Sequence, residues 1–163
     1  MFCSEGTAYQ EVHWGGLFGA ISAGVALALA GVVYAVDGVA LKQVSAAWAS
    51  APAAEQAARF ASAEAIRWLE WGVRSYQSFM SGLGLVLFAT TIVWTARITR
   101  PIGYIMGLNG LANIVLGWVT GTQGFSATSS VLYTSDALLF FVWIVWLLIV
   151  AWRMKVSVQA APA

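Results

Sequence analysis

Charged and polar side chains recur along one side of a helix that the sequence predicts to begin near residue 53 and to end at residue 95. On a helical wheel they fall within about 100° of arc; these residues are Arg67, Glu70, Arg74, Gln77, Ser78 and Ser81. Glu70 follows Arg67 by three residues and precedes Arg74 by four, which are the spacings at which opposite charges pair on a helix. Our first interpretation of the stripe is structural: its polar residues form hydrogen bonds between packed helices, and its charged end faces water. The alternative is a water-accessible vestibule that binds a small polar or amphipathic ligand.

Amides and a second carboxylate extend this polar set. Asn109 and Asn113 lie one turn apart at the depth of Ser78, which predicts a hydrogen-bonded layer between two helices. Its members are Gln77, Ser78, Ser81, Asn109 and Asn113. Glu70 and Asp136 are residue types that serve as general acid and base. No spacing in the sequence brings these two together, so we expect no catalytic residue.

Four apolar stretches position these side chains, at residues 14–36, 71–95, 102–120 and 131–152. At 1.5 Å per residue, each is close to the hydrocarbon thickness of about 30 Å. Hydrophobic residues make up 60% of the chain and charged residues 9%, compared with roughly 25% charged residues in soluble domains. The sequence therefore predicts an all-α polytopic membrane protein, a single four-helix domain packed as a bundle.

The segment 37–70, between the first two spans, predicts a helical hairpin that projects from the membrane. Leu41, Val44 and Trp48 recur at helical spacing, so the first helix either continues outward or turns along the surface. No proline follows Pro52 before residue 95, which favours one long return helix into the second span.

Basic residues without neighbouring acids predict the orientation of the chain. They lie between the second and third spans and after the fourth: Arg97, Arg100, Arg153 and Lys155. Helix parity places all of them on one side, and positive residues favour the cytoplasm. We therefore expect cytoplasmic termini and an extracytoplasmic hairpin. Residues 133–136 offer N-caps for the fourth helix at the outer surface.

A stripe of glycine residues runs along the third span. Gly103, Gly110 and Gly117 recur at intervals of seven, and Gly107 and Gly121 complete two G-x-x-x-G pairs. Small residues at such spacing let another helix backbone approach closely. The stripe predicts a packing interface, either within one chain or between chains.

Several classes of protein are excluded by composition. The net charge is +1 without a basic block, so we expect no nucleic-acid partner. Cys3 and His13 are the sole cysteine and histidine, which excludes an internal disulfide and a histidine-rich metal site in one chain. Phosphate-loop, dinucleotide and hydrolase motifs are absent from the sequence. We expect no cofactor and no metal.

The run Arg100-Pro101-Ile102-Gly103-Tyr104, a glycine-rich span and a closing Phe-Val-Trp-Ile-Val-Trp segment (residues 141–146) carry one resemblance. From Arg100 to Arg153 the chain resembles the C-terminal half of small bacterial integral membrane proteins of uncharacterised function. The resemblance implies a helical bundle in the bacterial inner membrane and identifies no catalytic residue.

Together these observations predict a non-catalytic integral membrane protein. It would be a homo-oligomer or an accessory subunit of a larger membrane assembly, packed through the glycine face of the third helix. Its partners would be membrane lipids and either itself or other membrane subunits. The alternative is a small-solute transporter, channel or lipophilic-ligand-binding protein that uses the polar seam. A third interpretation is an intramembrane enzyme.

Overall fold

The computed structural model describes the backbone of residues 4–95 and 100–159 and the side chains of residues 14–95 and 100–153. Cys3, Arg97 and the side chain of Lys155 lie outside this part. Among the described residues, all regular structure is helical, and four helical segments are long and apolar enough to cross a membrane. The predicted all-α class and the four apolar spans are therefore confirmed.

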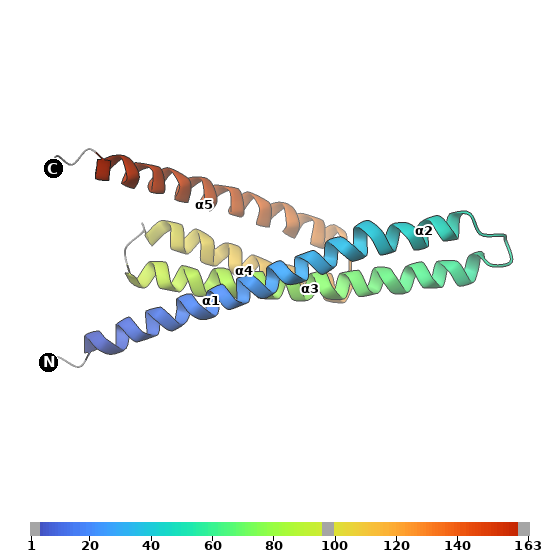
Figure 1. The fold of residues 1–163 in the computed structure, drawn as a ribbon, viewed down its shortest axis with the longest axis horizontal. Coiled ribbons are helices and arrows are strands. Elements are labelled where there is room, and N and C mark those ends of the chain that lie inside the picture. Colours follow the sequence, from blue (N-terminus) through green and yellow to red (C-terminus); the bar gives the residue numbers. More distant parts are fainter. Residues whose placement is uncertain (1–3, 96–99, 160–163) are drawn as a thin grey trace.

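The first two arms of the fold are long and antiparallel (Figure 1). Helix α1 (Ser4–Ala35) continues through a π-helical turn, η1 (Val36–Leu41), into α2 (Lys42–Ala49), and α3 (Gln56–Thr95) returns along them. The first helix thus continues outward instead of turning aside. A π-helical turn inserts extra backbone into a helix and is frequent at functional sites. This one carries Asp37.

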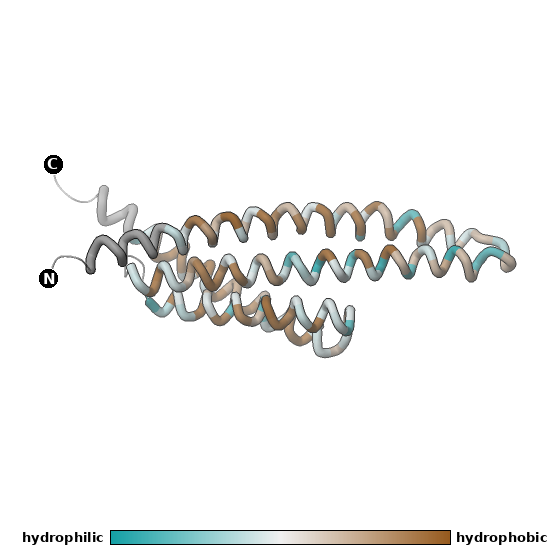
Figure 2. Tube along the Cα trace, turned by 90° about the horizontal axis from the view of Figure 1, so that it is seen from below, coloured by the Kyte–Doolittle hydropathy of each residue, from teal (hydrophilic) through white to brown (hydrophobic). Residues whose placement is uncertain are grey.

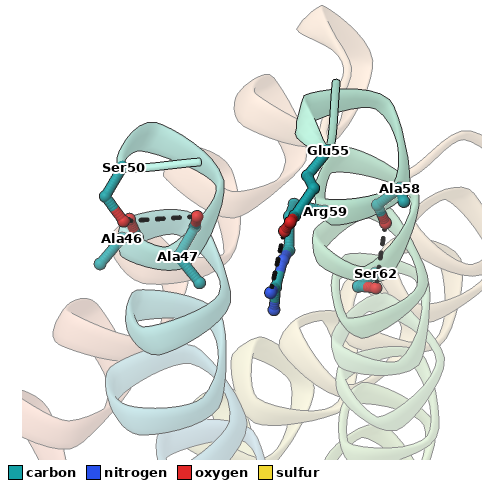
Figure 3. A network of polar contacts seen from close by, with 7 residues as sticks. All are labelled: Ala46, Ala47, Ser50, Glu55, Ala58, Arg59 and Ser62. Carbon is teal, nitrogen blue, oxygen red and sulfur yellow. Dashed lines mark hydrogen bonds and ion pairs between the residues drawn. The ribbon is translucent and has the colours of Figure 1, made fainter. Parts of the chain in front are cut away.

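The connection between α2 and α3 is short and closes through local hydrogen bonds (Figure 3). The Ser50 hydroxyl donates to the Ala46 carbonyl at 3.0 Å, and the Glu55 amide donates to the Pro52 carbonyl at 2.8 Å. Arg59 pairs with Glu55 at 3.3 Å one turn into α3, with both side chains more than half exposed. This tip is therefore a solvated polar turn, typical of a helix connection outside the apolar region.

The two remaining helices, α4 (Arg100–Gln123) and α5 (Ala127–Gln159), extend the molecule to one side. Within the described residues, the backbone of α1 packs along α3, α3 along α4, and α4 along α5. The four predicted helices therefore pack in an open row, with α3 and α4 between α1 and α5. One physical reason is the composition of α5, which has no glycine to allow a second close backbone contact.

The α3–α4 contact is the closest in the fold because glycine faces glycine. A Cβ built on Gly82 would lie 2.5 Å from the Gly110 carbonyl oxygen, and one on Gly110 would lie 2.8 Å from that of Gly82. Every glycine of the predicted α4 stripe meets α3, namely Gly103, Gly107, Gly110, Gly117 and Gly121. The stripe is a packing interface as predicted, but within the chain. Of the two alternatives that the sequence left open, the structure shows the contact within the chain, where α3 occupies the stripe.

The turn from α4 to α5 is shorter than the sequence suggested. Gly124 adopts a φ of 61° and its amide donates to the Thr120 carbonyl at 3.0 Å, a common way for a helix to end. Ser126 and Ser129 then exchange backbone-to-hydroxyl hydrogen bonds at 3.2 and 2.8 Å, as in a capping box. Helix α5 therefore starts at Ala127, and the N-cap predicted within residues 133–136 is wrong. Asp136 lies about 14 Å along the helix.

Hydropathy divides the molecule along its length (Figure 2). Hydrophilic positions recur along the hairpin half of α3, whereas apolar positions dominate nearer the chain termini. Because Gly124 lies against the ring of Trp71, α3 from Gln56 to Glu70 extends past the α4–α5 turn, by about 21 Å at 1.5 Å per residue. The polar half of α3 thus begins at the level of the turn where α4 ends and α5 starts.

Candidate functional site

Four charged side chains form a connected ionic cluster at the base of the hairpin: Asp37, Arg67, Glu70 and Arg74. Arg74 Nε donates to Glu70 Oε1 at 2.6 Å, and Arg67 Nη1 donates to Glu70 Oε2 at 3.2 Å. Arg67 Nη1 also lies 3.6 Å from Asp37 Oδ1, across the hairpin. The predicted pairing of Glu70 with both arginines is confirmed. Two cations face two carboxylates, so the cluster is neutral in itself.

Burial of this cluster increases from the hairpin side inward. The exposed fraction is 46% for the Asp37 side chain and 39% for Arg67. It falls to 22% for Arg74 and to zero for Glu70. A fully enclosed carboxylate needs both of its cationic partners, because desolvation removes the stabilisation by water. Glu70 is therefore the centre of the cluster.

Aromatic rings cover the inner end of the ionic cluster. The guanidinium carbon of Arg74 lies 5.4 Å from the centroid of the Phe125 ring, within the range of a cation–π contact. Phe125 also packs against Trp71 and Tyr133, with centroids 6.0 and 6.2 Å away. Gly124 makes this possible, since a Cβ there would lie 2.4 Å from the Trp71 ring. Arg67, Glu70 and Arg74, the residues predicted to line a vestibule, are thus paired with one another in this structure, and the outer members of the cluster remain exposed.

A second polar site, the amide–carboxylate network, lies between α4 and α5. It consists of Asn109, Asn113, Asp136 and Trp143. Both asparagine Nδ2 groups donate to Asp136 Oδ1. The Trp143 indole donates to Asn109 Oδ1 at 2.9 Å, and Asn113 Nδ2 also donates to the Asn109 carbonyl at 3.2 Å. This network places a carboxyl group among apolar spans, where ionisable groups are rare and mark functional sites.

The hydrogen bonds fix which way both amides point. Indole nitrogen can only donate, so the Asn109 oxygen must face Trp143 and its NH₂ group must face Asp136. Asn113 must likewise turn its NH₂ toward a backbone carbonyl, which can only accept. Asp136 Oδ1 is therefore held by two N–H donors. No cationic side chain pairs with Asp136 among the described residues.

The layer predicted across α3 and α4 is wrong in its partners. In the described part of the chain, Gln77, Ser78 and Ser81 form no hydrogen bond to α4. The reason is the turn of the helix: Asn109 precedes Gly110 by about 100° of rotation. Since Gly110 faces α3, Asn109 faces α5 instead. For the same reason Asp136 joins the amides, and it does not pair with Glu70 as a second carboxylate.

One hydrogen bond does cross between α3 and α4. The buried Ser75 hydroxyl donates to the Gly117 carbonyl at 2.7 Å. We expect Ser75→Ala to lower the free energy of unfolding by about 0.6–1.7 kcal/mol, between the mean and the maximum measured for hydrogen bonds between membrane helices. Ser62→Ala is the matched control, because Ser62 is exposed on the same helix and bonds only to its own turn. Titration with dodecyl sulfate in mixed micelles measures both, and equal effects would contradict the prediction.

Several residues of the site were missed from the sequence. Asp37 lies in the predicted hairpin and is not among the candidate residues, although an acid opposite Arg67 in an antiparallel hairpin is a signal for a pair. Phe125 and Tyr133 gave no signal, because their contact with Arg74 depends on the α4–α5 turn. Trp143 belongs to the apolar segment 141–146, and the structure shows that its indole also donates a hydrogen bond to Asn109.

The described residues belong to a helical protein with four apolar spans. It has an ionic cluster centred on the enclosed Glu70 and one carboxyl group, Asp136, between two spans. No family model, curated protein or solved structure matches the chain. What the protein does is therefore argued from its own residues.

Proposed function

We propose that the protein is a non-catalytic subunit of a membrane assembly, formed with further copies of itself or with unlike membrane proteins. The observation that carries this proposal is the open row of helices. A closed bundle gives each helix two neighbours, whereas among the residues that the structure describes α1 and α5 each pack along one other span. In this described part the row has two outer flanks.

The α5 flank is the more open of the two. Only 6% of the most apolar stretch of α5 is buried, compared with 22% for the span that includes α1. Its exposed apolar side chains include Leu138, Phe141, Val145, Leu148 and Trp152. Helices in membranes associate through van der Waals packing and interhelical hydrogen bonds, and α5 has the larger surface left for such packing. Because the glycine stripe is already occupied by α3, this flank replaces it as the proposed interface.

The hairpin supports the same proposal from outside the apolar region. Trp48 and Phe60 pair across its two arms with centroids 6.0 Å apart, yet remain 41% and 54% exposed. In an aqueous compartment, such exposed aromatic surface is typical of a contact with another protein. The hairpin is long enough to reach a partner beyond the membrane surface.

The expected orientation belongs to the proposal. Arg100 and Arg153 are exposed at the end of the molecule where both termini lie, and positive residues favour the cytoplasmic side. We place the hairpin outside the cytoplasm and the chain in a bacterial inner membrane, as the resemblance implies.

Lipids are the proposed small partners. An apolar groove of about 440 Å³ between α3 and α4 is lined by residues that include Val93, Trp94 and Leu108. A second groove, of about 390 Å³ between α1 and α3, includes Leu29, Val73 and Met80. Acyl chains fit these surfaces, whereas a polar solute would find few hydrogen-bond partners there. The grooves therefore favour lipid contacts over the transport of a small polar solute.

Cysteine cross-linking in native membranes tests the proposed interface. In a background without Cys3, we expect Leu148→Cys on α5 to cross-link to another chain. Leu108→Cys is the matched control, because Leu108 is similarly exposed but lies on α4. Native mass spectrometry of the gently extracted protein then gives the stoichiometry. A monomer in both measurements, or equal cross-linking at both positions, would contradict the proposal.

A further inference from the structure

The carboxyl group of Asp136 is the one charge in the two polar sites that no other charge balances. In the ionic cluster Arg67 and Arg74 balance Asp37 and Glu70. Asp136 is a third carboxyl group without an arginine to balance it, and it is half-buried between α4 and α5. An ionised carboxylate between apolar spans is strongly disfavoured unless a positive charge accompanies it.

The surroundings of Asp136 decide between a proton and a metal cation. A metal ion needs several oxygen ligands converging on one point. Here the two fixed amides present N–H groups to Oδ1, and the Asn109 oxygen is turned away toward Trp143. Among the described residues, the hydrogen bonds of this network hold no oxygen atom in a position to join Asp136 in binding a metal ion. The two N–H donors by themselves favour the ionised carboxylate, whereas burial between apolar spans favours the protonated form. Because both donors are on Oδ1, Oδ2 is the oxygen on which a proton can be held.

The groups around Asp136 complete its environment. On α5, Tyr133 lies one turn away on the same face, and its buried hydroxyl has no hydrogen-bond partner among the described residues. From α3, Arg74 lies near that hydroxyl, but Glu70 already holds it. The charged or titratable groups of α4 are Arg100 and Tyr104, both in its first two turns and remote from Asn113. Toward the chain termini the site meets an apolar core of Ala89, Met106 and Trp143.

We propose that Asp136 is a proton-binding site inside the membrane, oriented by the amides of Asn109 and Asn113. This proposal goes beyond the assembly role and does not depend on it. The carboxyl group takes up a proton on Oδ2 while Oδ1 keeps both amide donors. Its protonation state then sets the charge of the α4–α5 contact.

Labelling with dicyclohexylcarbodiimide tests this site, because the reagent adds to protonated carboxyl groups in apolar surroundings and leaves a stable N-acylurea. We expect a single label on Asp136 in the purified full chain, located by peptide mass spectrometry. We expect none on Asp37 or Glu70, because both carboxyl groups are paired with arginine. As pH rises through the ionisation of Asp136, labelling should fall about tenfold per pH unit. Asp136→Asn should abolish the label, whereas Asp37→Asn should retain it.

Three results would overturn the proposal. Absence of label on Asp136 in folded protein, together with no protonated-carboxyl infrared band that Asp136→Asn removes, would exclude a bound proton. Protection by sodium relative to choline at constant pH would assign a metal cation to the site. Protection in native membranes that purification removes would assign a cationic side chain of a partner. None of these depends on stoichiometry, so failure here is distinguishable from failure of the assembly proposal.

Discussion

Glu70→Ala is expected to lower the free energy of unfolding by about 3–5 kcal/mol, the cost of breaking a buried ion pair on one side. The Glu70 side chain is fully enclosed, and it bonds to Arg74 at 2.6 Å and to Arg67 at 3.2 Å. Its removal leaves the guanidinium of Arg74, 22% exposed, beside Phe125 and without an anion. Unfolding by dodecyl sulfate in mixed micelles, followed by circular dichroism, measures the change.

Glu55→Ala is the matched control for this prediction. Glu55 and Arg59 form the same acid-before-base pair four residues apart on the same chain segment, but both are more than half exposed. Exposed pairs of this kind contribute about 0.3–0.5 kcal/mol. A large effect for Glu70 and a small one for Glu55 would show that burial, and not the pairing itself, sets the cost. Similar effects for the two variants would contradict the enclosed position of Glu70.

Local helix geometry explains which parts of the site the sequence predicts well. The positions of Arg67, Glu70 and Arg74 on one helix face follow from 3.6 residues per turn alone. The spans follow from uninterrupted apolar length. Neither inference requires knowledge of how one helix packs on another, and both are confirmed.

The contacts between helices were harder to predict, because they depend on register and rotation. Asp37 contacts Arg67 only because the two arms of the hairpin run side by side, which brings η1 opposite the part of α3 that carries Arg67. Asp136 meets Asn113 only because α5 begins at Ala127 and places Asp136 inside the helix. A capping pattern at residues 133–136 and a serine pair at 126 and 129 are both plausible helix starts. The start that the chain adopts determines whether Asp136 is a cap or a member of a buried network.

The glycine stripe is a second case in which the sequence predicts a contact between helices but not the partner helix. Small residues at intervals of seven predict close packing but carry no information on whether the second helix belongs to the same chain. Gly82 on α3 supplies the missing information, because its own lack of a side chain matches Gly110. Two small residues that face each other in one chain favour an internal contact. Helix α5 has no glycine, so its contact with α4 is less close.

Gly82→Ala follows from this contact and carries the second large expected effect. The new Cβ would lie 2.5 Å from the Gly110 carbonyl oxygen and 2.7 Å from an Ile114 side-chain carbon. Because the first of these is backbone, α3 and α4 must separate, and we expect a loss of about 3 kcal/mol, the upper end of overpacking costs. Gly72→Ala is the control on the same helix, since nothing lies within 4 Å of its Cβ. There the gain in helix propensity should stabilise the protein, by up to about 1 kcal/mol.

Dilution separates an internal contact from one between subunits. If Gly82 packs within the chain, the loss in Gly82→Ala is independent of the protein-to-detergent ratio, because no association step is involved. If the stripe instead joined two chains, the loss would shrink as the protein is diluted and the wild type itself dissociates. The dodecyl sulfate titration at two protein-to-detergent ratios therefore measures both the cost of the substitution and the place of the contact. A cost that vanishes on dilution would return the glycine stripe to an interface between subunits and would contradict the α3–α4 packing described above.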